Sequence, residues 1–163
     1  MSLNFFEASC QEPSLNFSLF GICDDQNGTK AYTNIDHPDN WIATVKNERS
    51  VELVFTAIDK CVIKDNEYPG RGRCDGMLTA AGLLYLVELN DTPKDWLSAT
   101  IGQLESTIQF FIDNHDLGNY KHKKAFACNK KHRHFQEIDN EFNLRFFRKY
   151  RFRIDVQAEI IVI

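Results

Sequence analysis

The most regular hydrophobic pattern in the sequence is a pair of short apolar segments, at residues 74–78 and 83–89. The second segment is apolar at almost every position, which is typical of a strand buried on both faces of a sheet. The four residues between the segments end in Gly82, which favours a short connection and a hairpin. Upstream, residues 41–45 and 51–63 are rich in β-branched and aromatic residues and predict further strands.

The apolar period becomes helical after residue 92. A helix is predicted over about 93–115, because Pro93 suits a first helical position and Thr92 suits an N-cap. Its apolar face comprises Leu97, Ile101, Leu104, Ile108, Phe111 and Ile112. A second helix is predicted to run to about Tyr150, with an apolar face made of Phe135, Ile138, Phe142 and Phe146.

Further segments predict strands around these helices. Asn27-Gly28 separates the apolar segments 19–23 and 31–33 and predicts a hairpin. Residues 125–128 form a short apolar run between the helices, and residues 154–162 alternate with a period of two. The order of elements predicts an α/β (α+β) fold, in which a mixed central sheet is flanked by helices.

The composition bounds the class of protein. The chain has 163 residues, of which 43% are hydrophobic, so one domain with a buried core is predicted over residues 1–163. No apolar run reaches the roughly 18 residues that a membrane helix needs, and no signal peptide is visible, so a cytoplasmic location is predicted. The cysteines are odd in number, widely spaced and without a Cys-x-x-Cys motif, which indicates reduced thiols: Cys10, Cys23, Cys61, Cys74 and Cys128.

Charge is distributed unevenly along the chain. The formal net charge of −4 disfavours binding to nucleic acid, but residues 121–153 contain 11 Lys or Arg and only 3 acids. The other residues contain 8 Lys or Arg and 20 acids, so an acidic body precedes a basic C-terminal third. Six basic residues are therefore candidates for binding a nucleic-acid backbone: Lys130, Lys131, Arg133, Arg145, Arg148 and Lys149. The alternative is a basic loop and helix that are merely solvated.

Two acids lie in segments where a charge is expensive. Asp75 and Glu88 interrupt or end the paired apolar segments, and a buried carboxylate loses free energy of hydration unless something compensates its charge. A hairpin that pairs Met77 with Leu84 puts both acids on one face, within about 8 Å between Cα atoms. A slip of one residue would separate them, so the numbers of paired residues should have an odd sum. A divalent cation such as Mg²⁺ would then compensate both charges together.

These residues also carry a family resemblance. Cys74-Asp75, then twelve residues, then Glu88-Leu89-Asn90 resembles the signature of the PD-(D/E)XK (restriction-endonuclease-like) phosphodiesterases, and the order of elements over about 51–128 is similar to their core. Gln103, on the helix that follows, is similar to the helical glutamine of the RecB-like branch. The resemblance implies a catalytic set: Asp75, Glu88, Asn90 and Gln103. It also implies that Asp75, Glu88 and the main-chain carbonyl of Leu89 bind Mg²⁺ or Mn²⁺.

The sequence departs from the family pattern at one important position. Asn90 stands where a lysine is expected, and an amide can orient water but brings no positive charge to a phosphate. Two functions from different classes therefore stay open: a metal-dependent nuclease acting on DNA or RNA, and a catalytically inactive relative that binds nucleic acid or a protein. A third possibility is a toxin-neutralising or assembly partner that uses an acidic surface.

The two acids also have a purely structural interpretation. Asp75 and Glu88 could end their strands at the surface and form ion pairs with basic neighbours: Arg71, Arg73 or Lys94. Asp59, which interrupts another apolar segment, is a candidate for a third acid near the cation, and the alternative is an acid on the wet face of a strand.

Overall fold

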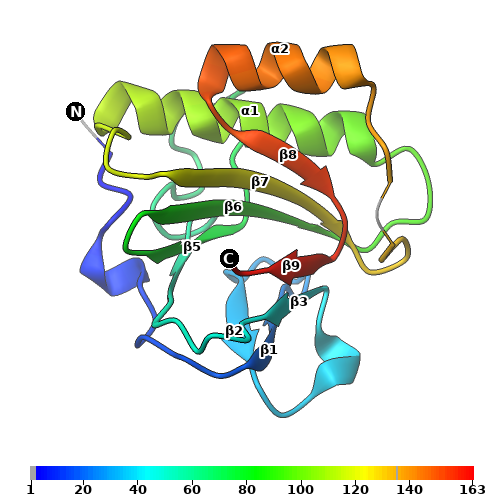
Figure 1. Cartoon of the computed structure of the whole chain (residues 1–163). Coiled ribbons are helices and arrows are strands. Elements are labelled where there is room, and N and C mark those ends of the chain that lie inside the picture. Colours follow the sequence, from blue (N-terminus) through cyan, green and yellow to red (C-terminus); the bar gives the residue numbers. More distant parts are fainter. Residues whose placement is uncertain (1–2, 135) are drawn as a thin grey trace.

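Residues 3–134 and 136–163 are described by the computed structural model, which places them in three layers. Two helices form the first layer, a mixed five-stranded sheet forms the second, and a mixed four-stranded sheet forms the third (Figure 1). Both helices cover the same face of the larger sheet, and the smaller sheet covers its other face. The predicted mixed α/β fold is confirmed at this level, although helices do not flank the sheet on both sides.

The larger sheet has the order β4-β5-β6-β7-β8. Its strands are β4 (Val54–Ala57), β5 (Gly76–Ala80), β6 (Leu83–Asn90), β7 (His122–Asn129) and β8 (Arg153–Val156). Strands β4, β5 and β6 form an antiparallel meander, whereas β7 runs parallel to β6 and β8 runs parallel to β7. The two parallel steps are made by crossover helices, α1 (Leu97–Asn114) and α2 (Asn140–Tyr150). The strand β6 is thus central, as its continuous apolar sequence predicts.

The smaller sheet has the order β2-β1-β3-β9. Its strands are β1 (Leu19–Cys23), β2 (Tyr32–Asn34), β3 (Ala43–Lys46) and β9 (Glu159–Ile161). The short 3₁₀ helix η2 (Pro38–Asn40) contacts β1, whereas η1 (Ala8–Cys10) lies near the larger sheet, where Gln11 pairs with Thr56 of β4. The predicted hairpin around Asn27-Gly28 is confirmed by the antiparallel pairing of β1 with β2. The prediction of a single strand over 154–162 is wrong, because β8 ends at Val156 and the chain then enters the smaller sheet as β9.

Alternate residues of β6 and β7 face two separate hydrophobic layers. Leu84 and Leu86 pack under the helices, whereas Tyr85 and Val87 pack against the smaller sheet. On β7, Phe126 points to the smaller sheet as well. Both faces of these two strands are therefore buried, which explains why the sequence shows continuous apolar runs instead of alternation.

The helix boundaries differ from those predicted. The first helix begins at Leu97 rather than about 93, after Trp96 as N-cap without a side-chain hydrogen bond, and the preceding Asp95 has a left-handed φ of 55°. The second helix begins at Asn140, where Asp139 accepts a hydrogen bond from the Glu141 N–H at 3.1 Å. The part of that prediction that falls on Phe135 lies outside the described residues. Neither described helix is long and apolar enough to cross a membrane.

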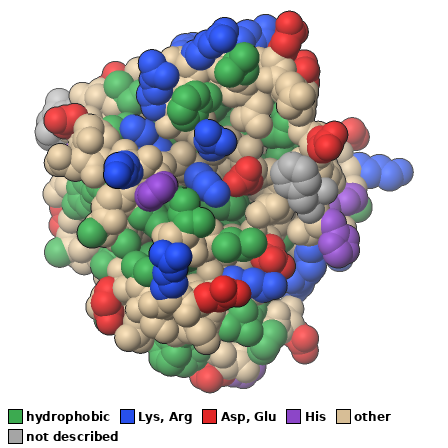
Figure 2. Space-filling view, in the orientation of Figure 1, with side chains coloured by type: hydrophobic (Ala, Val, Ile, Leu, Met, Phe, Trp, Pro, Cys, Tyr) green, Lys and Arg blue, Asp and Glu red, His purple; other side chains and the backbone are tan. Residues whose placement is uncertain are grey.

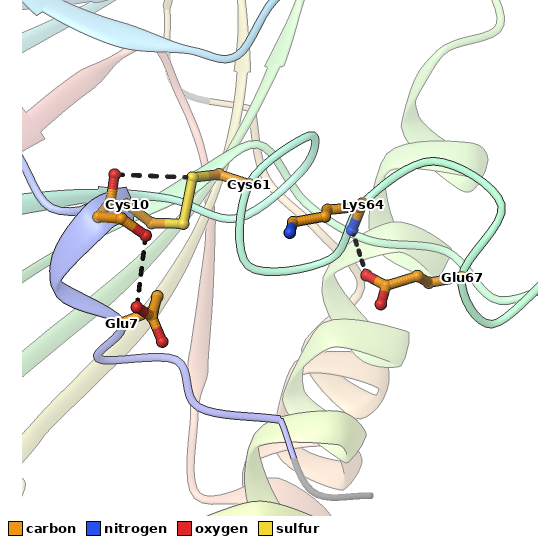
Figure 3. Close-up of a disulfide and its surroundings, with 6 residues drawn as sticks. Glu7, Cys10, Cys61, Lys64 and Glu67 are labelled. Atoms are coloured by element: carbon orange, nitrogen blue, oxygen red, sulfur yellow. Dashed lines mark hydrogen bonds between the residues drawn. A yellow bond between two sulfur atoms is a disulfide. The ribbon is translucent and has the colours of Figure 1, made fainter.

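A disulfide joins the N-terminal segment to the loop after β4. Cys10 and Cys61 are bonded, with Cα atoms 5.7 Å apart, and Figure 3 shows the bond beside η1. In the same loop the Lys64 N–H donates a hydrogen bond of 2.7 Å to the Glu67 carboxylate. The expectation of five reduced thiols is therefore wrong for two of them, since Cys23, Cys74 and Cys128 alone are free and all are buried. The predicted location stays a prediction, and disulfides are more usual in oxidising compartments.

Candidate active site

The β5–β6 ladder brings Asp75 and Glu88 together. Gly76 pairs with Val87, and each further pair in the ladder has the same sum of residue numbers, so Asp75 lies opposite Glu88 one step further on. The expected odd sum is confirmed, and a register of this parity puts both side chains on one face of the hairpin. The predicted register was shifted by two residues, because the hairpin turn contains only two residues and Gly82 adopts a left-handed φ of 73°.

The backbone around Asp75 is fixed from two sides. Its carbonyl accepts a hydrogen bond of 2.9 Å from the Ile58 N–H, which extends the β4–β5 pairing. The preceding Cys74 N–H donates to the Thr107 Oγ1 at 2.7 Å, and that hydroxyl donates to the Gln103 carbonyl at 2.8 Å. Helix α1 therefore positions the start of β5, and through it the Asp75 side chain.

The Asp75 carboxylate is nearly inaccessible to water. Asp75 is 8% exposed, and its Oδ2 accepts a hydrogen bond of 2.7 Å from the Leu89 N–H. Burial raises the pKa of Asp75 to about 7, although the hydrogen bond from Leu89 acts in the opposite direction. The carbonyl of Leu89 projects from the same edge of β6 as its N–H, which is the side on which Asp75 lies.

Glu88 is less well satisfied than its neighbour. Its Oε1 is buried and has no hydrogen-bond partner among the described residues. Burial, and then the negative charge of Asp75, raise the pKa of Glu88 well above its usual range. Without a cation, burial and mutual repulsion therefore oppose the ionisation of both carboxyls together.

The smaller sheet contributes a further acid that the sequence did not single out. Asp24 follows β1 directly, and its negative charge raises the pKa of both Asp75 and Glu88. Asp59 acts on Glu88 in the same direction. Within residues 3–134 and 136–163, no three His, Cys, Asp or Glu side chains are arranged to hold a metal by themselves. A cation here would therefore depend on two carboxylates, a carbonyl, water and ligand phosphate, which is a usual set for Mg²⁺.

Both predicted catalytic amides, Asn90 and Gln103, form hydrogen bonds at helix α1, and Gln103 is part of that helix. Asn90 Nδ2 donates a hydrogen bond of 2.6 Å to the Thr100 Oγ1. Gln103 Oε1 accepts one of 2.6 Å from the Arg73 N–H. Each side chain therefore has a structural partner, and a catalytic role for either stays a prediction.

Nearby arginines do not neutralise the acidic pair. Arg73 binds Asp59 at 2.5 Å and Asp65 at 2.6 Å, and the Arg71 guanidinium lies 3.5 Å from the centre of the Phe110 ring. In the described part of the chain, neither Asp75 nor Glu88 forms an ion pair. The structural interpretation of these two acids as surface ion pairs is therefore wrong, and Arg73 pairs with Asp59 and Asp65 instead.

The six predicted phosphate-binding residues fall into two groups. In the loop after β7, Lys130 Nζ donates to the Asp39 carbonyl at 2.7 Å, Lys131 lies 3.9 Å from Asp91, and Arg133 donates to the Trp41 carbonyl at 3.1 Å. The other group is on the exposed surface of α2: Arg145, Arg148 and Lys149. Figure 1 shows the loop and the end of α2 at opposite sides of the molecule, so these residues do not form one patch.

Comparisons with known proteins do not identify the chain. Neither protein-family models, curated proteins nor solved structures give a match. The functional proposal therefore depends on the geometry around Asp75 and Glu88.

Proposed function

We propose that this protein is a divalent-cation-dependent phosphodiesterase acting on nucleic acid, in which Asp75, Glu88 and the Leu89 carbonyl hold Mg²⁺ or Mn²⁺. One observation carries the proposal. Two carboxylates from neighbouring strands lie opposite each other, largely buried and without ion-pair partners in the described chain, and one has a buried oxygen without a partner. Such a pair is unfavourable when ionised, and a hard cation is the ligand that would compensate it.

The chemistry of the residues fits this assignment. Carboxylate and carbonyl oxygens are the ligands that Mg²⁺ and Mn²⁺ prefer, and phosphodiester oxygens and water complete such sites. A bound divalent cation would polarise the phosphate and lower the pKa of a bound water. The chain itself orients Asp75 through the hydrogen bond from the Leu89 N–H and fixes the start of β5 through Thr107.

The topology around the two acids also supports membership of the PD-(D/E)XK superfamily. The antiparallel meander β4–β6 is followed by the crossover helix α1 and by the parallel strand β7. Asp75 precedes β5 and Glu88 lies near the end of β6, which is where the resemblance puts the acidic motif. Asn90 in place of lysine remains the departure from the pattern.

A second candidate function is a catalytically inactive relative that binds nucleic acid or protein. The observation in its favour is the engagement of both amides, since Asn90 binds Thr100 and Gln103 binds the Arg73 backbone. With these groups occupied and no lysine at position 90, a cation could bind without the groups that activate water.

The two candidates are separated by a cleavage assay. Fluorescent single- and double-stranded DNA and RNA are incubated with the protein and Mg²⁺, Mn²⁺ or EDTA, and the products are resolved on a gel. An enzyme cleaves at least one substrate with metal, and Asp75→Asn and Glu88→Gln abolish the cleavage, whereas Asp36→Asn, at an exposed position, leaves it unchanged. No cleavage of any substrate, with metal binding that both variants remove, favours the second candidate.

Calorimetry then checks the cation site itself. Titration of Mn²⁺ into the wild type should give binding that is lost in Asp75→Asn and kept in Asp36→Asn. If the wild type binds neither Mg²⁺ nor Mn²⁺ at millimolar concentration, the proposal of a cation-dependent enzyme is wrong. Asn90→Lys tests the departure from the family pattern, because it should raise a weak cleavage rate if lysine is the missing group.

A further inference from the structure

A basic pocket lies at the end of the larger sheet opposite to the acidic pair. It is formed where β7 begins, where β8 begins and where α2 ends, and its volume is about 440 Å³. Five of its lining residues are basic: Lys121, Lys123, Lys124, Arg151 and Arg153. Asp155 is the one acidic side chain among the lining residues, so the side chains carry a clear excess of positive charge. In Figure 2, Lys and Arg side chains gather on the face that carries α2, β7 and β8, with hydrophobic side chains between them.

Most of this charge is not compensated inside the protein. Lys124 Nζ lies 3.7 Å from the Asp155 carboxylate, which is the one ion pair that these lining residues form within the described chain. The other four cations have no acidic side chain within 4 Å among residues 3–134 and 136–163. Like charges that converge on a hollow produce a positive potential that an anion would neutralise. The pocket therefore favours an anionic ligand.

Arginine and an aromatic ring are combined at one wall of this pocket. The guanidinium carbons of Arg151 and Arg153 lie 5.8 Å and 5.4 Å from the centre of the half-buried Phe147 ring. Contact with the ring restrains both side chains, and a planar guanidinium can then donate two parallel hydrogen bonds to a phosphate group. Phosphate is accordingly the anionic group that this wall suits best.

The backbone of Arg151 is unusual for a residue of this type. It adopts a left-handed conformation, with φ 63° and ψ 19°, directly after α2, and its N–H donates to the Phe147 carbonyl at 2.7 Å. Helix ends of this geometry favour glycine, because a side chain is strained there. An arginine at such a position is explained if its side chain binds a ligand, since strained residues cluster at binding sites.

An adjoining cavity indicates which kind of phosphate compound fits. A hollow of about 280 Å³ shares Phe147, Arg153 and Asp155 with the basic pocket and continues between α2 and β8. Leu144, which is exposed, and Ile154 line this second hollow. A nucleic-acid strand presents phosphate and a flat base side by side, and bases stack on aromatic and apolar side chains. Free phosphate would use only the basic half.

We propose that the basic pocket at the start of β7 and β8 is an anchoring site for the phosphate backbone of a single nucleic-acid strand, with Phe147 and Leu144 contacting a base. The site is distinct from the acidic pair. Lys124 pairs with Arg153 in the sheet, whereas Glu88 lies level with Ala127, roughly 10 Å further along β7. The ligand, nucleic acid, is the same as in the proposed function. The inference rests on that function only for the role of the anchor in the cell, because binding at the basic pocket requires no cleavage.

Binding is measured by fluorescence anisotropy with a fluorescein-labelled 20-nucleotide single-stranded DNA in EDTA, over a series of salt concentrations. Arg153→Gln and Lys123→Gln should each weaken binding about 3- to 10-fold and reduce the salt slope by about one. Arg49→Gln removes an exposed charge in the turn after β3 and should leave binding unchanged. Unchanged affinity and slope in both pocket variants would overturn the proposal.

Arg151→Gly separates binding from folding. Because glycine is favoured at this helix end, the variant should unfold at the same or a higher temperature than the wild type and still bind the strand several-fold more weakly. A variant that is as stable as the wild type and binds equally well contradicts the role given to Arg151. This test holds even if another pocket variant fails to fold.

Competition identifies the source of the phosphate. Unlabelled strand should compete at micromolar concentration, whereas inorganic phosphate and vesicles with anionic lipid should not compete until far higher concentrations. Equal competition by inorganic phosphate, or binding to vesicles that Arg153→Gln abolishes, would overturn the assignment to nucleic acid.

Failure of this inference can be told apart from failure of the proposed enzyme. Asp75→Asn should bind the strand as well as the wild type in EDTA, since it lies at the other site. Binding that depends on the pocket, without cleavage under any metal condition, refutes the enzyme and supports the anchor. Cleavage and binding that survive all pocket substitutions support the enzyme and refute the anchor.

Discussion

Asp75→Asn is expected to stabilise the folded protein at alkaline pH while it removes the cation site. Asparagine keeps the size of the side chain, and its Oδ1 can accept the hydrogen bond that Leu89 now donates to Asp75. It removes one of two buried charges that repel each other. Functional residues often lower stability in this way, so a gain on substitution is a signature of function.

The size of the effect follows from the pKa of Asp75. Burial raises it from the usual 3.8 to about 7, so the folded protein binds this proton more tightly than the unfolded chain does. The contribution to stability is therefore complete below pH 4 and is lost as the pH rises through about 7. At about 1.4 kcal/mol per pH unit, the loss between pH 5 and pH 8 is up to about 3 kcal/mol. The asparagine variant has no such loss at this position.

Urea unfolding of the wild type and of Asp75→Asn at pH 5 and pH 8, in EDTA, measures the effect. The stability difference in favour of the variant should be larger at pH 8 by about 1 to 3 kcal/mol, and comparison of the two pH values cancels pH-independent effects of the substitution. Asp36→Asn, at an exposed position, should have the same unfolding free energy as the wild type at both pH values. Mg²⁺ at pH 8 should stabilise the wild type and Asp36→Asn but not Asp75→Asn. An equal difference at both pH values would refute the raised pKa and the buried charge pair.

Three further results are expected. Cation binding to the acidic pair should release about one proton at pH 7 and tighten as the pH rises from 6 to 8, as calorimetry in buffers of different ionisation enthalpy can measure; no release would contradict the raised pKa values of the pair. Reduction of the Cys10–Cys61 bond, which spans 51 residues, should lower the unfolding free energy by up to about 4 kcal/mol through chain entropy, and an unchanged urea midpoint with dithiothreitol would count against this. Gly21→Ala should destabilise by about 1 to 3 kcal/mol or more, because an added Cβ would collide with the Trp41 ring, whereas a wild-type melting temperature would show that the ring can move.

The sequence was sufficient to predict the central hairpin and the shared face of its acids. A segment as apolar as 83–89 must be buried on both faces, and the parity of the pairing then decides where Asp75 and Glu88 point. The predicted and the observed registers differ by two residues, but in both the numbers of paired residues have an odd sum. Either register therefore keeps the two acids on one face. The exact register depended on a turn of two residues, which the sequence 79–82 does not distinguish from one of four.

Other features depend on long-range packing and leave no local pattern. The alternation over 154–162 suits a strand in either sheet, and no glycine or proline marks the change from β8 to β9 at Gln157-Ala158. Asp24 approaches the acidic pair only because the two sheets pack together. The basic pocket, likewise, joins residues near 121–124 to Arg151 and Arg153, which adjacent parallel strands bring together.

The distribution of arginines gives a physical reason to expect a ligand at the acidic pair. Arg73 is close in sequence to Asp75, yet it binds Asp59 and Asp65, and Arg71 lies over Phe110. A fold selected only for stability would neutralise its most buried carboxylates first, because uncompensated burial is among the costliest arrangements in a protein. Here the acids that water reaches more easily receive the arginine, and the buried pair receives none. Such a breach of a local rule is expected where something that binds the protein supplies the missing charge.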